Sequence, residues 1–229
     1  MIELSKACLE CENKCSIFRL LTEFELELIE KNRYEVKFKP GEVILKQGTA
    51  FTHVVAHMDG LAKIYIEGYH GKDLLLKIQK PKGIVAGPGM YLDNRHHFSF
   101  SALTNCVACL IDINVFKEVI RSNPVFMEAF MTEYNLRSVN FFQTMISLTQ
   151  KQMHGRIADA LIYLSDQVFC SSKYDMIISR QELADMTAMT KESASRIIQQ
   201  FKNEGIITLQ GNCLEILNQE QLRNISITG

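Results

Sequence analysis

The stretch SRQELADMTAMTKESASRIIQQFKNEGII, residues 179–207, sets the structure expected for the C-terminal part of the chain. Ser179 and Glu182 stand three residues apart ahead of an apolar segment, a capping box that starts a short helix. Thr190 is a favourable N-cap for a second helix. In that helix apolar side chains recur at i, i+3, i+4 and i+7, namely Ala194, Ile197, Ile198 and Phe201. Two short helices joined by a few residues predict a helix-turn-helix.

The polar side of the second helix, called the reader face below, consists of Glu192, Ser195, Arg196 and Gln199. Arginine can donate two hydrogen bonds to guanine and glutamate can accept one from cytosine, so Arg196 and Glu192 are candidates for reading G·C pairs. The alternative is a solvated face on which these two side chains pair at i, i+4. The capped first helix and the segment GIITLQGNCLEIL, which predicts a two-stranded wing, together favour DNA reading.

Charge limits how such a domain can hold DNA. The whole chain has a formal net charge of −1, and residues 151–229 contain eight Lys and Arg against nine Asp and Glu. No general basic field attracts phosphate, so a few placed cations must do so. The candidates for phosphate contacts are Arg180, Lys191 and Lys202, together with Lys151 and Arg156.

A long helix is expected upstream, because Pro124 suits a first helical turn and neither Gly nor Pro follows before residue 148. Six residues at alternating spacings of three and four form the pattern of a two-helix interface, called the seam below. They are Met131, Tyr134, Ser138, Phe141, Met145 and Leu148. A second apolar stripe consists of Phe130, Val139, Phe142 and Ile146. Two apolar faces favour a homodimer over a helix buried within one chain.

Residues 34–113 contain short β-branched or aromatic runs punctuated by Gly and Pro, which predicts a compact all-β roll. An amphipathic helix with Thr22 and Glu25 as its capping box precedes the roll. The expected fold is α+β, with four parts. These are a cysteine-containing segment (1–20), an effector-sensing jelly-roll domain (21–122), a dimerisation helix (123–149) and a winged helix-turn-helix (150–229).

Composition excludes several classes of protein. A hydrophobic fraction of 47% argues against disorder, and no apolar run of about 18 residues or signal peptide is present, so we expect a cytoplasmic protein without a membrane partner. No P-loop, no dinucleotide fingerprint and no nucleophile–base motif appears, so we do not expect an enzyme.

This order of parts resembles the Crp/Fnr family of transcription regulators, over nearly the whole chain. The family's E-x-x-S-R reader matches Glu192, Ser195 and Arg196 in residues 179–207. The resemblance implies a cyclic-nucleotide-binding-like roll, a homodimer on a palindromic operator of double-stranded DNA, and action on RNA polymerase. Ala188 departs from the family, because glycine usually occupies this place in the turn. Glycine adopts a left-handed backbone at little cost and alanine does not, so we expect a strained turn.

The resemblance also bears on which signal the roll senses. In its cyclic-nucleotide branch a glutamate and an arginine hold the ribose and the cyclic phosphate. Here Gly87 and His96 occupy those places, with Arg95 one residue away, so we do not expect cAMP to bind. A module that binds cyclic nucleotides without DNA is a further alternative, but it would not need the winged helix.

Cysteines offer a different sensor. Cys8, Cys11 and Cys15 with Cys109 could hold a 4Fe-4S cluster, as the resemblance to the Fnr branch implies, with Cys106 as the competing fourth ligand. The second and third thiols stand two residues closer together than in that branch. The alternatives are zinc, buried thiols without a metal, haem or NO sensing near His96 and His97, or another small molecule in the roll.

Overall fold

A computed structural model of the chain describes residues 8–229. It consists of two compact units. The first ends at Ser138 and leaves out Glu67–Lys77, which belongs with Val139–Gly229 in the second. The boundary therefore falls inside helix α3 (Pro124–Gln150), the helix expected over residues 123–149.

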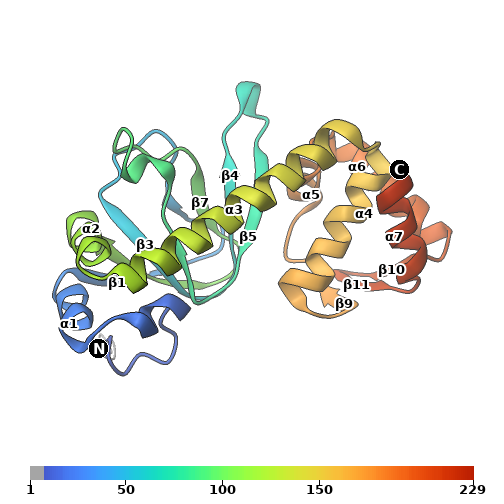
Figure 1. Cartoon of the computed structure of the whole chain (residues 1–229). Coiled ribbons are helices and arrows are strands. Elements are labelled where there is room, and N and C mark those ends of the chain that lie inside the picture. The colour runs from blue at the N-terminus through green and yellow to red at the C-terminus, as the bar shows by residue number, and fades with distance from the viewer. Residues whose placement is uncertain (1–7) are drawn as a thin grey trace. The chain divides into compact units, whose positions relative to one another are not determined.

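Two antiparallel four-stranded sheets form the roll, whose strands belong to the first unit apart from residues 74–77 of β5 (Figure 1). One has the order β1-β8-β3-β6, with β1 at Arg33–Phe38, β8 at Cys106–Asp112, β3 at His53–Asp59 and β6 at Gly83–Val85. The other has the order β2-β7-β4-β5, with β2 at Val43–Leu45, β7 at Ser99–Ala102, β4 at Ala62–Ile66 and β5 at Leu74–Gln79. Short 3-10 turns lie at Tyr69–Gly71 and Pro88–Met90. The expected all-β roll within an α+β fold is confirmed.

Strand β8 shows how the alternation of side chains divides the unit into two cores. Cys106 and Ala108 belong to the core between the two sheets. Cys109 and Ile111 point to the other face, which packs against the cysteine segment and helices. Because Cys106 and Cys109 are three residues apart, the two thiols lie on opposite faces of the same sheet.

The helices of the outer core are η1 (Ser16–Leu20), α1 (Glu23–Lys31), α2 (Ile113–Ser122) and the start of α3. The capping box of α1 is confirmed: Glu25 N donates to Thr22 Oγ1 at 3.3 Å, and Thr22 N donates to Glu25 Oε2 at 2.8 Å. Helix α2 was not expected from the sequence. It begins at Asp112, whose carboxylate accepts from Asn114 N and Val115 N.

The second unit contains α4 (Met153–Tyr163), a π-helical turn η4 (Leu164–Phe169), α5 (Arg180–Met186), α6 (Lys191–Asn203) and α7 (Gln219–Thr228). Its small sheet has the order β10-β11-β9, with β10 at Ile207–Gln210, β11 at Cys213–Ile216 and β9 at Lys173–Asp175. Strands β10 and β11 are the expected wing. Strand β9, and helix α7 packed against α4, were not expected.

Asp159 of α4 links the end of α3 and helix α7 to α4. Its carboxylate accepts from Ser147 of α3 at 2.5 Å, from Lys151 Nζ at 2.8 Å and from Ser226 of α7. The last turns of α3 are thereby fixed to the helices that carry the helix-turn-helix. Within the described residues, no helix has both the length and the apolar character needed to cross a membrane.

Candidate nucleic-acid interface and thiol pocket

The helix-turn-helix begins with the expected caps. Ser179 Oγ accepts from Glu182 N at 3.1 Å and the Glu182 carboxylate accepts from Ser179 N at 2.7 Å, which completes the capping box of α5. Thr190 Oγ1 accepts from Ser193 N at 3.2 Å and starts α6. Both helix starts therefore follow from local side-chain chemistry.

The turn between α5 and α6 has the left-handed backbone at Ala188 that the sequence predicts. Ala188 has φ +48°, in the left-handed region where a side chain is strained. Arg156 of α4 contacts this turn from outside, because its Nη1 donates to the carbonyl oxygens of Thr187 at 3.1 Å and Ala188 at 3.3 Å. The Arg156 guanidinium is thus engaged with the turn, and its role in the structure is to hold that strained backbone.

We expect Ala188→Gly to raise the free energy of unfolding by about 0.5–1 kcal/mol. Relief of a left-handed alanine gains about 1–2 kcal/mol, which the larger backbone entropy of glycine in the unfolded chain partly offsets. Ala184→Gly is the matched control, because Ala184 is buried in α5 and should lose about 1 kcal/mol or more. Guanidinium unfolding curves measure both. Equal destabilisation by the two substitutions would contradict strain at Ala188.

Helix α6 has one buried and one open side. The apolar stripe of Ala194, Ile197, Ile198 and Phe201 is fully buried. On the reader face, Glu192, Arg196 and Gln199 are exposed and Ser195 is half-buried. Among the described residues no ion pair joins Glu192 to Arg196, and Gln199 contacts only its neighbour Asn203, at 2.9 Å. The reader face is therefore open, without the i, i+4 pair of the alternative interpretation.

The cations of this unit fall into two sets. Lys151, Lys173 and Arg223 form ion pairs with Asp159 (2.8 Å), Glu215 (3.1 Å) and Asp166 (2.7 Å). Five others have no ion pair among the described residues 139–229. Four of them lie on α5 and α6, namely Arg180, Lys191, Arg196 and Lys202, and the fifth, Arg156 of α4, donates to carbonyl oxygens of the turn between these two helices. Although the domain has no net positive charge, its unpaired positive charge is concentrated on the helix-turn-helix.

Helix α3 leaves much apolar surface uncovered. Of the seam, Met131, Phe141 and Met145 are 47%, 40% and 47% exposed, while Tyr134, Ser138 and Leu148 are half-buried. In the second stripe only Phe130 is buried against the roll, and Val139, Phe142 and Ile146 are exposed. Of the second stripe, Phe130 alone is therefore covered within the chain.

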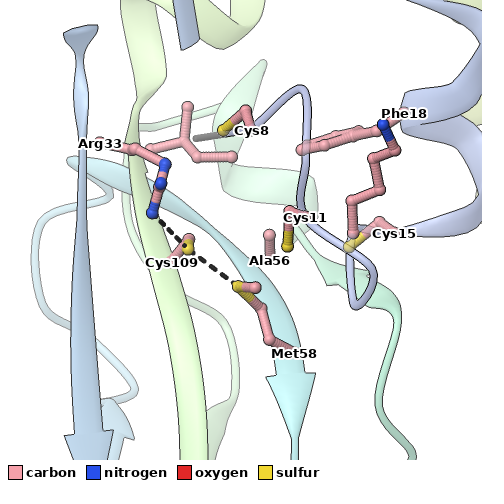
Figure 2. Close-up of a pocket in the computed structure, with 10 residues that line it drawn as sticks. Cys8, Cys11, Cys15, Phe18, Arg33, Ala56, Met58 and Cys109 are labelled. Atoms are coloured by element: carbon pink, nitrogen blue, oxygen red, sulfur yellow. Dashed lines mark hydrogen bonds between the residues drawn. The ribbon is translucent and has the colours of Figure 1, made fainter. Parts of the chain in front are cut away.

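Four cysteines lie around one small pocket of the first unit, called the thiol pocket below. Cys8, Cys11 and Cys15 come from the N-terminal segment and Cys109 from β8, and Figure 2 shows them around a common space. Phe18, Ala56 and Ile111 provide apolar walls. Cys106 lies in the other core, where its Sγ donates to Leu61 O at 3.3 Å. Of the two candidates in β8, the structure brings Cys109 to the N-terminal cysteines.

Burial favours the protonated form of three of these thiols, Cys8, Cys15 and Cys109. It raises the pKa of Cys8 to about 12 and that of Cys109 to about 11, and it also raises the pKa of Cys15. Metals bind the thiolate, so loading this pocket must release protons. Sequence reasoning missed two further pocket residues, Arg33 and Met58, which both contact the Cys109 sulfur.

The four cysteines of the pocket are a donor set of the kind that holds an iron–sulfur cluster. Four-coordinate zinc needs its sulfur ligands about 3.8 Å apart, given Zn–S bonds of about 2.3 Å. Among the described residues no three Cys, His, Asp or Glu side chains gather closely enough to hold one metal ion. A cluster of several irons spaces its thiolates more widely, and an apolar pocket with one buried cation suits its negative charge.

The segment that corresponds to the nucleotide-binding segment of the family's cyclic-nucleotide branch does not fit such a ligand. A Cβ atom at Gly87 would lie 3.1 Å from the ring of Phe98, so an aromatic side chain fills the place of the ribose-binding glutamate. His96 stacks on Phe51 with 4.4 Å between ring centroids, and Arg95 donates to Gly48 O at 2.8 Å. No carboxylate and arginine converge here, as a ribose and a cyclic phosphate would require.

Comparisons with known proteins agree with this architecture. Residues 155–225 match the Crp-like helix-turn-helix domain, and residues 35–123 match the cyclic nucleotide-binding domain. The chain is 25% identical over 200 residues to the transcriptional activator protein Anr of Pseudomonas protegens, covering 86% of this chain and 80% of that protein. It is 22% identical over 238 residues to an anaerobic regulatory protein of Aggregatibacter actinomycetemcomitans, covering 99% and 91%. A crystal structure assigned to the Crp/Fnr family, from Eubacterium rectale, has a TM-score of 0.78 at 16% identity, covering 95% and 100%.

Proposed function

This chain belongs to the Crp/Fnr family of DNA-binding transcription regulators, which are not enzymes, and from that premise we propose a redox- or oxygen-responsive homodimer. In this proposal the thiol pocket holds a 4Fe-4S cluster, α3 pairs two copies, and the two reader faces bind a palindromic operator. The observation that carries it is the gathering of Cys8, Cys11, Cys15 and Cys109 around one pocket.

The exposed apolar surface of α3 supports the dimer. A helix with this many exposed large apolar side chains is unfavourable in water and stable when a second helix covers it. The seam has the spacing of a two-stranded coiled coil. A twofold axis along α3 presents two copies of α6, so the operator shares that symmetry. DNA as the partner assigns the protein to the cytoplasm, with RNA polymerase as the machinery on which it acts.

A contact path between the thiol pocket and α3 supports control by the cluster. Ser16, adjacent to Cys15, donates through Oγ to Glu133 Oε1 at 3.4 Å. Glu133 in turn forms an ion pair with Arg137 at 3.6 Å, one turn further along α3. When bound, a cluster provides a group that oxygen converts or destroys. Cys15 would be one of the residues that hold the cluster, and through Ser16 and Glu133 a change at Cys15 would be passed to the helix that contains the seam.

The relatives support the same assignment through their names alone: one is a transcriptional activator and the other an anaerobic regulatory protein. We extend the word "anaerobic" from the second relative's name to this chain because the thiol pocket contains four cysteines. The segment that matches the cyclic-nucleotide site also supports the proposal, since Phe98 takes the space of a side chain at residue 87 and His96 is stacked on Phe51.

Anaerobic reconstitution with a pair of cysteine variants tests the proposal. The wild-type protein should take up four irons and four sulfides per protomer, lose them in air, and change its mobility-shift affinity for a palindromic probe as it does so. Cys109→Ala should abolish uptake, whereas Cys106→Ala should load like the wild type. A colourless wild-type protein without iron or sulfide, or zinc in its place, would overturn the cluster.

A further inference from the structure

An ion pair between Arg33 and Glu30 lies at the thiol pocket, with Arg33 in the pocket lining and Glu30 half-buried behind the lining residues. Arg33, at the start of β1, has a side chain only 5% exposed. Its Nε and Nη2 donate to the Glu30 carboxylate of α1 at 2.9–3.0 Å, in a two-pronged arrangement. A buried guanidinium is costly to desolvate, and this pairing makes it stable.

Each member of the pair also contacts one of the candidate ligands. Arg33 Nη1 donates to Cys109 Sγ at 3.1 Å, as the dashed line in Figure 2 shows. Glu30 Oε2 accepts from the backbone N–H of Cys8 at 2.7 Å. The pair therefore bridges the N-terminal segment and strand β8, which are 101 residues apart in sequence (Cys8 to Cys109).

We propose that the Arg33–Glu30 pair is the positioning device of the thiol pocket, which holds Cys8 and Cys109 in register and directs positive charge at a thiolate-bound cluster. The inference rests on the proposed function for the identity of the cluster, but the positioning of the two cysteines does not. Arg33 lines the pocket and Glu30 does not, so the cationic member of the pair faces the pocket.

The sulfur of Met58 marks the other side of Cys109. The Cys109 thiol donates to Met58 Sδ at 2.9 Å, a contact that exists only while the thiol carries its proton. The Arg33 contact persists with a thiolate, since the guanidinium is the donor. Arg33 and Met58 thus contact the Cys109 sulfur in different ways, Arg33 as a donor to it and Met58 as an acceptor from it.

The test compares the double variant Arg33→Gln/Glu30→Gln with the wild type and with Arg19→Gln. The double variant removes both charges, so it leaves no unpaired ion buried and is expected to fold. Arg19 is an exposed arginine of η1 outside the pocket lining and serves as the matched control. Thermal melting verifies folding of all three proteins before any comparison.

Two readouts separate the inference from the proposed function. In reconstituted protein, the visible absorption of the cluster should decay in air at least about tenfold faster in the double variant, the range typical of lost contacts behind metal ligands. In metal-free protein, dibromobimane cross-linking of Cys109 to the N-terminal cysteines, mapped by mass spectrometry, should fall several-fold. Arg19→Gln should match the wild type in both.

The outcomes differ for the two ideas. If the wild-type protein takes up no iron but its cross-link depends on Arg33 and Glu30, the cluster fails and the positioning role stands. If the folded double variant has wild-type cluster lifetime and wild-type cross-linking, the positioning role is overturned while the proposed function stands.

Discussion

Arg196→Ala removes sequence discrimination and leaves weak, nonspecific DNA binding intact. Arg196 is exposed on the reader face and forms no ion pair among the described residues, so its guanidinium is available to a guanine. One bidentate arginine–guanine contact contributes about 1–3 kcal/mol of discrimination. Two half-sites double this value, so the preference for the operator should fall by about 30-fold to about 10⁴-fold.

The measurement needs the operator first, which selection from random duplexes by the wild-type protein provides. Mobility shifts then compare operator and scrambled probes at one fixed salt concentration. Lys191→Ala is the control. Loss of a phosphate contact should weaken binding to both probes equally and reduce the dependence of affinity on salt concentration. If the Arg196→Ala variant discriminates between the probes as well as the wild type does, Arg196 does not read a base.

Met145→Glu should convert the protein to a monomer. Met145 is 47% exposed at a seam position, so twofold pairing would place two glutamates against each other in an apolar interface. An uncompensated buried charge costs about 3–5 kcal/mol, which raises the dimer dissociation constant by at least about 100-fold. The affinity for a two-half-site probe should then fall to that for a single half-site.

Gln143→Glu provides the control, because Gln143 is exposed on α3 two residues away and outside the seam. It introduces the same charge and should leave the dimer unchanged. Analytical ultracentrifugation across a concentration series measures both variants. If the Met145→Glu protein still sediments as a dimer, the seam is not the interface, and the stripe of Val139, Phe142 and Ile146 is the remaining candidate.

Local chemistry explains which helices could be predicted. The caps at Thr22, Ser179 and Thr190 act within three residues, so sequence alone located those three helix starts. Helix α7 and strand β9 were missed because their stability comes from distant partners. Strand β9 is three residues long and exists because it pairs with β11, and α7 is held on α4 through Ser226 and Asp159.

The thiol pocket shows the same division. Alternation along β8 requires that Cys106 and Cys109 face opposite ways, which could have been argued from spacing. Which face the N-terminal cysteines cover depends on how η1 and α1 pack, and no local pattern contains that information. Arg33 was missed for a related reason, since an arginine at the start of a strand ordinarily reaches solvent.

The concentration of unpaired cations on α5 and α6 has a consequence for how this regulator finds its target. Elsewhere in residues 139–229, Lys151, Lys173 and Arg223 are paired with carboxylates and Arg156 is hydrogen-bonded to the turn between α5 and α6, so we expect the surface that reads bases to be the one that attracts phosphates. Few phosphate contacts mean weak retention on random sequence. We therefore expect short dwell times on random DNA and a shallow dependence of nonspecific binding on salt concentration.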